Sequence, residues 1–245
     1  MSRRTLAVSA LALVAAGCAS APRTPVRREL IRGILASTVQ LRSEREGGIR
    51  RAASGVVVAA DVRSRRAWIV TAKHFLDPPS RQELFVRLPG RANVGGASAV
   101  FVSREHDLAI LEADNLEVAP VRLKMVAHLG DDIMVVAFPW GQRFTVVGGL
   151  VSQIASPVTD QILVAGSARM VSASVSYGSS GGGVFDAHSG ELIGIVETYR
   201  TAKVTIPEMK DRVLEIPVPG ETTLVPASVI LQFMQDFGLS RRLVK

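Results

Sequence analysis

The chain has little cysteine, few aromatic residues and few histidines for its 245 residues. Its one cysteine, Cys18, excludes a disulfide within the chain. Aromatic residues make up only 5% and no basic run is interleaved with them, so nucleic acid is not an expected partner despite a net charge of +7. Four scattered histidines and a single cysteine do not suggest a metal site, and no cofactor is expected.

What is present at the start has the layout of an export signal. Two arginines precede an apolar run over residues 6–16, which is too short to span a bilayer as a helix of the mature protein. The run ends in VAAGC, which resembles the lipobox of bacterial lipoproteins, whose cysteine is acylated and becomes the mature N-terminus. We predict a signal peptide over 1–17 and lipidation at Cys18; an uncleaved anchor helix is the alternative.

The lipobox resemblance also implies a location and a membrane partner. A lipid on Cys18 would hold the protein to a membrane of the cell envelope. Ala19 does not resemble the aspartate that signals inner-membrane retention, which favours the outer membrane, with the protein facing the periplasm. Residues 18–32 are rich in Pro and Arg and are predicted to form a flexible tether.

Short apolar runs, each bounded by Gly, Pro or charged residues, dominate the rest of the chain. No helical pattern of 10–15 residues separates them, which favours an antiparallel sandwich or barrels over βαβ units. The runs cover 55–59, 67–71, 84–88, 108–111, 133–137, 145–147, 162–164 and 192–196. One helix is predicted over 227–237, where apolar residues recur at three- and four-residue steps before Gly238.

A glycine-rich stretch, SYGSSGGGVF over 176–185, could bind phosphate, form a flexible turn or present a nucleophile. Phosphate binding is disfavoured, because no Lys follows the last glycine and no GxGxxG is present. Two other stretches bear on the choice between turn and nucleophile. WIVTAKH ends in His74, and HDLAIL carries Asp107 at the start of an apolar run.

Taken together, WIVTAKH, HDLAIL and GSSGGGVF resemble the trypsin-like (chymotrypsin-fold) serine peptidases, and most closely their HtrA/Deg-type bacterial members, here without a PDZ module. The resemblance runs from about residue 35 to residue 237. It implies an all-β fold of two antiparallel six-stranded β-barrels with a C-terminal helix. The expected units are barrels over 33–120 and 121–226, followed by a helix and tail over 227–245.

The same resemblance implies roles for three residues. His74 is the expected general base, Asp107 orients it, and Ser180 is the nucleophile. A serine hydroxyl needs a base to take its proton as it attacks, and imidazole can return that proton to the leaving amine. Ser180 rather than neighbouring Ser179 is followed by Gly-Gly, and the amides of Gly178 and Ser180 are expected to form the oxyanion hole.

The expected substrate is a protein or peptide. By resemblance, Ser174 lies at the floor of the specificity pocket, and Thr198 and Tyr199 line its wall. No acidic residue stands at that floor, so we expect a preference for small to medium uncharged side chains. The polar stretch 200–220 is predicted to be a long loop beside the site.

Two positions depart from the family pattern. Ser179 stands where Asp or Asn is usual, and Gly183 stands where Pro or Ala is usual, which predicts a looser loop. These departures leave two alternatives to an endopeptidase, namely a catalytically silent binding protein of the same fold and an esterase with the same triad.

Overall fold

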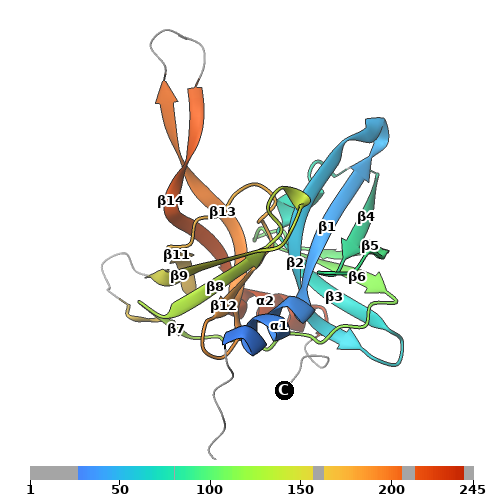
Figure 1. Cartoon of the computed structure of the whole chain (residues 1–245), viewed down its shortest axis with the longest axis horizontal. Helices are drawn as coiled ribbons and strands as arrows, with labels where there is room; N and C mark the ends of the chain where they lie inside the picture. Colours follow the sequence, from blue (N-terminus) through green and yellow to red (C-terminus); the bar gives the residue numbers. More distant parts are fainter. Residues whose placement is uncertain (1–26, 80, 157–162, 206–212, 240–245) are drawn as a thin grey trace, which may run out of the picture.

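Two closed antiparallel barrels of six strands each stand side by side in the computed structural model (Figure 1). The structure describes residues 27–79, 81–156, 163–205 and 213–239. The predicted all-β double barrel is therefore confirmed. The predicted signal peptide over 1–17 and Cys18 lie outside the described residues.

The N-terminal barrel closes in the strand order β1-β2-β3-β6-β5-β4. Alternate side chains of these strands point inward, and Leu41, Ile69 and Leu111 are completely or almost completely buried inside it. Its strands are β1 (Thr38–Arg45), β2 (Arg50–Asp61), β3 (Arg66–Thr71), β4 (Gln82–Arg87), β5 (Val94–Val102) and β6 (Ala109–Asp114), with short 3-10 helices η1 (Glu46–Gly48) and η2 (Lys73–Leu76).

The C-terminal barrel closes in the order β11-β14-β13-β12-β8-β9, and β7 pairs with β10 in a small separate sheet. Val135, Val184 and Leu224 are buried inside it. Its elements are β7 (Ala127–His128), β8 (Asp132–Ala137), η3 (Pro139–Gly141), β9 (Thr145–Ile154), β10 (Ala165–Gly166), β11 (Ala168–Val171), β12 (Gly183–Asp186), β13 (Leu192–Thr205) and β14 (Val213–Pro226).

A shared apolar layer joins the two barrels. Val58 and Leu108 from the N-terminal barrel and Phe185 from the C-terminal barrel belong to one buried cluster. Helices α1 (Arg27–Ser37) and α2 (Ala227–Asp236) close one end of this layer, on the same side of both barrels (Figure 1). The predicted C-terminal helix is confirmed. In the described part of the chain, no helix has the length and apolar character needed to cross a membrane.

Helix α1 corrects the predicted tether. Residues 18–32 were expected to lack structure, but the helix begins at Arg27. Leu30 and Ile34 stand one turn apart and are buried in the shared layer, where Leu30 lies 2.7 Å from the position that a Cβ on Gly190 would take. The tether prediction is therefore wrong over 27–32. The first residues of the helix are polar, and the apolar residues that pack it against the barrels begin only at Leu30, so the sequence before Leu30 resembles a tether.

Two further expectations differ from the structure. The strand predicted over 162–164 is absent at Leu163 and Val164, and the short strand β10 begins one residue later; Ile162 lies outside the described residues. The stretch 200–220 was expected to be a loop, but its described residues continue β13 and β14, which pair as far as Thr205 and Val213. This two-stranded ribbon extends away from the C-terminal barrel (Figure 1).

Candidate active site

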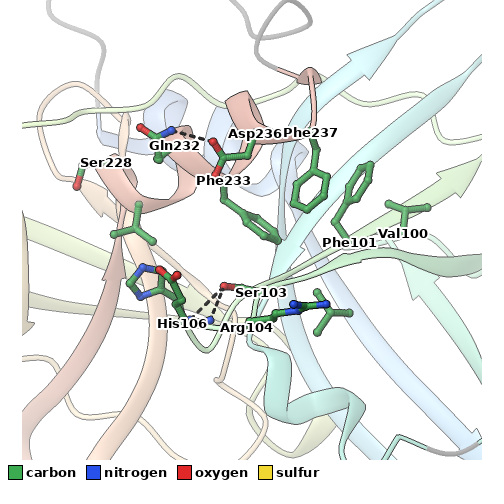
Figure 2. Close-up of a pocket in the computed structure, with 13 residues that line it drawn as sticks. Val100, Phe101, Ser103, Arg104, His106, Ser228, Gln232, Phe233, Asp236 and Phe237 are labelled. Carbon is green, nitrogen blue, oxygen red and sulfur yellow. Dashed lines mark hydrogen bonds between the residues drawn. The ribbon is translucent and has the colours of Figure 1, made fainter.

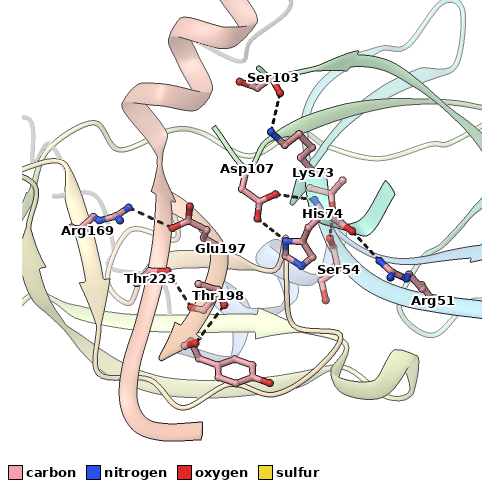
Figure 3. A network of polar contacts seen from close by, with 12 residues as sticks. Arg51, Ser54, Lys73, His74, Ser103, Asp107, Arg169, Glu197, Thr198 and Thr223 are labelled. Carbon is pink, nitrogen blue, oxygen red and sulfur yellow. Dashed lines mark hydrogen bonds and ion pairs between the residues drawn. The ribbon is translucent and has the colours of Figure 1, made fainter. Parts of the chain in front are cut away.

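His74 and Asp107 lie together at one end of the N-terminal barrel (Figure 3). The chain leaves β3 at Thr71 and turns into η2, which carries His74, and Asp107 stands just before β6, the strand that pairs with β3. The His74 Nδ1 atom is 2.6 Å from Asp107 Oδ2, and the His74 main-chain N–H donates to Oδ1 at 2.8 Å. Both carboxylate oxygens thus bind one residue, which fixes the position of the imidazole.

These contacts set the protonation of the pair. The hydrogen bond to Asp107 raises the pKa of His74 above its ordinary value and outweighs partial burial, which lowers it. Burial raises the pKa of Asp107, but hydrogen bonds from the His74 ring and main chain outweigh it and bring that pKa below its ordinary value. Asp107 is therefore an anion at neutral pH and holds a proton on Nδ1, which leaves Nε2 as the acceptor.

Cationic side chains brace this corner from two sides. An Nη1 atom of Arg51 donates to the carbonyl of His74 at 3.1 Å. Lys73 donates from Nζ to the carbonyl of Ser103 at 3.2 Å, which ties η2 to the loop that leads into Asp107 (Figure 3). Lys73 and the His74 main chain are therefore anchored to the rest of the barrel.

Ser180 lies on the loop between β11 and β12, and Ser54 of β2 holds this loop across the barrel boundary. The Ser54 N–H donates to the Ser180 carbonyl at 2.9 Å, and its hydroxyl donates to the Gly178 carbonyl at 2.9 Å. The same hydroxyl accepts the Phe138 N–H at 2.8 Å. Ser54 is fully buried, so each of these bonds satisfies a group that water cannot reach.

Hydrogen bonds accepted by two carbonyls fix the orientation of two peptide planes in the loop. The Tyr177 carbonyl accepts the Trp140 N–H at 2.8 Å, and the Ser179 carbonyl accepts the Gly182 N–H at 2.8 Å. In a planar trans peptide the following N–H points the opposite way. Over the described residues, neither the Gly178 N–H nor the Ser180 N–H donates to another group. Both amides predicted for the oxyanion hole are thus available to a ligand.

Close packing explains the glycines. Gly178 has φ +86°, and an added Cβ would lie 2.7 Å from the Trp140 nitrogen. At Gly181, with φ +77°, it would overlap the Ser54 carbonyl. Gly183 is buried in β12, where a Cβ would collide with the ring of Phe185. The ring fills the space that Pro or Ala would need at this position, which explains the departure from the family pattern; the looser loop stays a prediction.

The imidazole and the Ser180 hydroxyl are not hydrogen-bonded to each other in the structure. Over the described residues, no hydrogen bond involves the Ser180 side chain, which is half-buried. Catalytic hydrogen bonds are often long in a ligand-free enzyme and shorten when substrate binds. The structure brings the elements carrying His74, Asp107 and Ser180 to the boundary between the barrels, where Ser54 bonds the Ser180 loop.

Of the three residues predicted for the substrate pocket, Ser174 lines a cavity to which Thr198 and Tyr199 do not contribute. Ser174 accepts the Gly220 N–H at 3.2 Å and lines a cavity of about 190 Å³ whose walls include Val135 and Val147. Thr198 and Tyr199 lie in β13 and are not among its lining residues. Their part in substrate selection stays a prediction.

A larger depression of about 740 Å³ lies elsewhere, between β5, α2 and the loop before Asp107 (Figure 2). Phe101 and Phe237 stack there with ring centroids 4.0 Å apart. None of the three predicted catalytic residues lines it. It backs the loop in which Ser103 Oγ accepts the His106 N–H at 3.1 Å, one residue before Asp107.

Sequence reasoning missed the residues that position the site. Ser54, Arg51 and Trp140 act through contacts to residues far away in the chain. The signal at Ser54 is a hydroxyl directly before the apolar run 55–59, since a buried polar group needs a partner. Arg51 and Trp140 carry no comparable signal, because their contacts depend on how the barrels pack.

The fold, with a His-Asp pair on one barrel and a serine loop framed by glycines on the other, is that of the double-barrel serine peptidases. The trypsin-like peptidase domain family matches residues 53–195, and the chain belongs to that family. This match covers more than half of the chain and includes positions 74, 107 and 180.

Curated relatives are Deg-type proteases. The serine endoprotease DegS of Haemophilus influenzae is 30% identical over 144 residues, which is 58% of this chain and 40% of that protein. A probable periplasmic DegP-like serine endoprotease of Hahella chejuensis is 28% identical over 144 residues, 58% of this chain and 28% of that protein. The matches thus cover less than half the length of these relatives. The expected resemblance to the HtrA/Deg type is confirmed, and the relatives that carry it are serine endoproteases.

Solved structures agree on the fold. A serine endoprotease from Yersinia pestis superposes with a TM-score of 0.65 at 20% identity, over 90% of this chain and 68% of that one. Rv3671c from M. tuberculosis H37Rv, as a mutant in an inactive form, gives a TM-score of 0.61 at 18% identity, over 88% of this chain and 93% of that one. At these identities the likeness supports the double barrel alone.

Proposed function

We propose that the protein cleaves proteins or peptides of the cell envelope through a His74-Asp107-Ser180 triad. The observation that carries the proposal is the His74–Asp107 pair, in which both carboxylate oxygens hold one histidine. That arrangement leaves Nε2 to take the proton of Ser180 as its Oγ attacks the scissile carbonyl, and then to deliver it to the leaving amine.

The Gly178 and Ser180 N–H groups, which are free to bind a ligand, support the proposal of an oxyanion hole. Charge develops on the carbonyl oxygen as Ser180 attacks, and we propose that the Gly178 and Ser180 N–H groups, which donate to no other group over the described residues, bind it. Their availability favours catalysis over a silent binding role. The relatives, which are endoproteases, favour amide over ester substrates. For the residue before the scissile bond, we propose a small to medium uncharged side chain near Ser174, Thr198 and Tyr199.

The proposed location rests on the first residues of the sequence. VAAGC supports acylation of Cys18 and attachment to an envelope membrane, and Ala19 supports the outer membrane, facing the periplasm. A Cys18→Ser variant expressed beside the wild type in a bacterium fed an alkyne fatty acid tests this. The wild type should carry the label and sediment with membranes; a wild type without label would contradict the lipid anchor.

Labelling with a fluorophosphonate tests the enzymatic proposal directly. The protein lacking residues 1–18 should be labelled at Ser180, located by peptide mass spectrometry, and Ser180→Ala should not be labelled. Ser179→Ala is the matched control and should still be labelled, because the Ser179 side chain is buried. Truncating the nucleophile of a working triad should lower kcat on the order of 10⁶-fold. Label on Ser179, or on neither serine, would contradict the proposed triad.

A further inference from the structure

A cationic pocket of about 350 Å³ adjoins the candidate active site, and we call it the arginine pocket. Its charged lining residues are Arg42, Arg50, Arg51 and Arg87, and no acidic residue is among those that line it. We propose that the arginine pocket binds acidic side chains of the substrate that follow the scissile bond. This inference rests on the proposed function and names its substrate class.

The position of the arginine pocket ties it to the site. Its wall includes Tyr177, the residue before the Gly178 amide, and Trp140, whose ring lies 5.2 Å from that of Tyr177. It also includes Arg51, which binds the His74 carbonyl. The pocket therefore adjoins both the imidazole corner and the proposed oxyanion hole.

The arginine pocket lies on the flank that a leaving group would occupy. The residues predicted to select the side chain before the scissile bond, Ser174, Thr198 and Tyr199, do not line it. Its wall is instead anchored to His74, the residue that hands its proton to the leaving amine. The chain that begins with that amine is therefore the part of the substrate nearest to the arginines.

Strand register sets the spacing of the pocket. On the outer face of the N-terminal barrel, Arg42 of β1 lies opposite Phe85 of β4, and Gln40 lies opposite Arg87. The Arg42 guanidinium lies 5.1 Å from the centroid of the Phe85 ring. Stacking on an aromatic ring restrains a guanidinium and leaves its edge free to bind a carboxylate with two parallel hydrogen bonds.

Over the described residues, the guanidinium groups of the pocket outnumber the carboxylates near them. Arg42 and Arg50 share a single carboxylate, that of Glu44, at 3.2 and 3.1 Å. Arg51 and Arg87 donate to main-chain carbonyls, which carry no net charge. Glu83 lies opposite Glu44 in the strand register, at the outer end of the patch. Four guanidinium groups thus face two carboxylates, both beyond the pocket wall.

A neighbouring pocket extends the positive surface. It shares Gln40, Arg87 and Gly141 with the arginine pocket and adds Arg143 from the segment after η3. An extended peptide advances about 3.3 Å per residue, so a substrate crossing both pockets would place successive side chains among separate arginines. A run of acidic residues after the cleavage point suits this surface better than one isolated acid.

Matched peptides test the proposal. Three internally quenched substrates share every residue up to the scissile bond and carry Glu-Glu, Gln-Gln or Lys-Lys after it. We expect kcat/KM for the Glu-Glu peptide to exceed that for Gln-Gln about tenfold at low salt, the combined effect of one or two partly exposed ion pairs. The advantage should shrink as ionic strength rises, and Lys-Lys should be the slowest.

Arginine variants locate the effect. In the Arg42→Gln/Arg87→Gln double variant, the Glu-Glu to Gln-Gln ratio should fall to about twofold. Arg63→Gln removes one positive charge from the β2–β3 turn, beyond the far end of β2 from Arg51, and should keep the tenfold ratio. Fluorophosphonate labelling of each variant shows that it is folded. Equal rates for both peptides in the wild type, or a tenfold ratio that persists in the double variant, would overturn the proposal.

A binding experiment distinguishes a failure of this inference from a failure of the proposed function. Fluorescent Glu-Glu and Gln-Gln peptides are titrated into the Ser180→Ala protein and followed by anisotropy. Tighter binding of Glu-Glu without cleavage of any peptide by the wild type would reject the proposed enzymatic function and retain the acid-binding pocket.

Vesicles of phosphatidylglycerol provide the other comparison. A double variant that loses vesicle binding but keeps its peptide preference would show that the arginine pocket faces lipid, and this result would overturn the inference.

Discussion

In the N-terminal barrel, His74 is held by both carboxylate oxygens of Asp107, whereas in the C-terminal barrel the Ser180 loop is held through main-chain groups. The first half depends on charge and therefore responds to pH. The second depends on peptide orientation and therefore on residues without a side chain. A substitution can thus disable either half in a distinguishable way, by changing protonation or by changing backbone geometry.

The largest effect is expected at Asp107. Replacing Asp107 with Asn removes the anion that fixes the histidine tautomer, and kcat should fall by about 10⁴-fold. The test is single-turnover cleavage of a peptide by wild type and variant at equal concentrations. An Asp107→Asn enzyme within tenfold of the wild type would show that the pair is structural.

The same variant changes the pH profile. Activity requires neutral His74, and the hydrogen bond to Asp107 raises its pKa above 6.5. The acidic limb of kcat/KM in the wild type should therefore have its midpoint above pH 6.5, and activity should be lost as pH falls through it. Without the carboxylate, the limb should move to lower pH. An acidic limb that stays at the same pH in Asp107→Asn would show that a group other than His74 causes it.

The second effect tests the backbone half. Gly178→Ala places a Cβ against the Trp140 nitrogen at a positive φ, so the peptide before it must rotate. We expect fluorophosphonate labelling to slow by about 10²–10³-fold, the effect of losing one oxyanion donor. Gly148→Ala is the matched control, because a Cβ there meets nothing within 4 Å. Equal labelling rates in the two variants would contradict the proposed hole.

Ser54 sharpens the comparison, because it belongs to one barrel and holds the loop of the other. Ser54→Ala leaves the Gly178 carbonyl and the Phe138 N–H unpaired, which should lower the free energy of unfolding by about 2–4 kcal/mol. Labelling should slow about tenfold. Ser43→Ala is the control, since the buried Ser43 hydroxyl has no partner over the described residues. Denaturant melts measure the free energy of unfolding of both variants. Equal losses of stability in Ser54→Ala and Ser43→Ala would show that Ser54 only fills space.

The smallest effect is expected away from both halves. Lys124, on the segment between the barrels, pairs with Asp186 of β12. Burial raises the pKa of Asp186, but the Lys124 bond and the Ser189 and His188 amides outweigh it and bring that pKa to about 2. A lowered acid pKa stabilises the fold at neutral pH, and this stabilisation is lost as pH falls from about 4 through 2.

Asp186→Asn should therefore cost about 2 kcal/mol of unfolding free energy at pH 7 and flatten its decline in acid. Asp114→Asn removes an exposed ion pair with Arg66 and should cost less than about 1 kcal/mol. Thermal melts from pH 7 to pH 2 give the comparison. Parallel curves for Asp186→Asn and wild type would show that the buried pair does not govern acid stability.

Chemistry made part of this site readable from sequence. His74, Asp107 and Ser180 stand out because acyl transfer needs those residue types, and Gly178 and Gly181 mark positive φ angles. The double barrel followed from short apolar runs and family resemblance. Helix α1 was missed because few of its residues are apolar and buried. These residues pack against Gly190, which is far away in the chain, so the local sequence gives little sign of the helix.

Long-range packing hid the rest. Ser54 and Gly178 are 124 residues apart, and nothing local in either stretch indicates that they meet. The arginine pocket was equally hidden, because the sequence shows its arginines as scattered charges. Only the register of β1 against β2 and β4 places Arg42, Arg50 and Arg87 on one face, while Arg51, opposite buried Ser43, reaches the His74 carbonyl.

The bonds from Ser54 have a consequence for the order in which the protein matures. Synthesis proceeds from the N-terminus, so the barrel that carries His74 can fold first. The Ser180 loop then reaches its final shape only when the second barrel docks on Ser54. A half-made chain would hold the proposed base but no ordered nucleophile loop, and the proposed triad would be complete only once both barrels have docked.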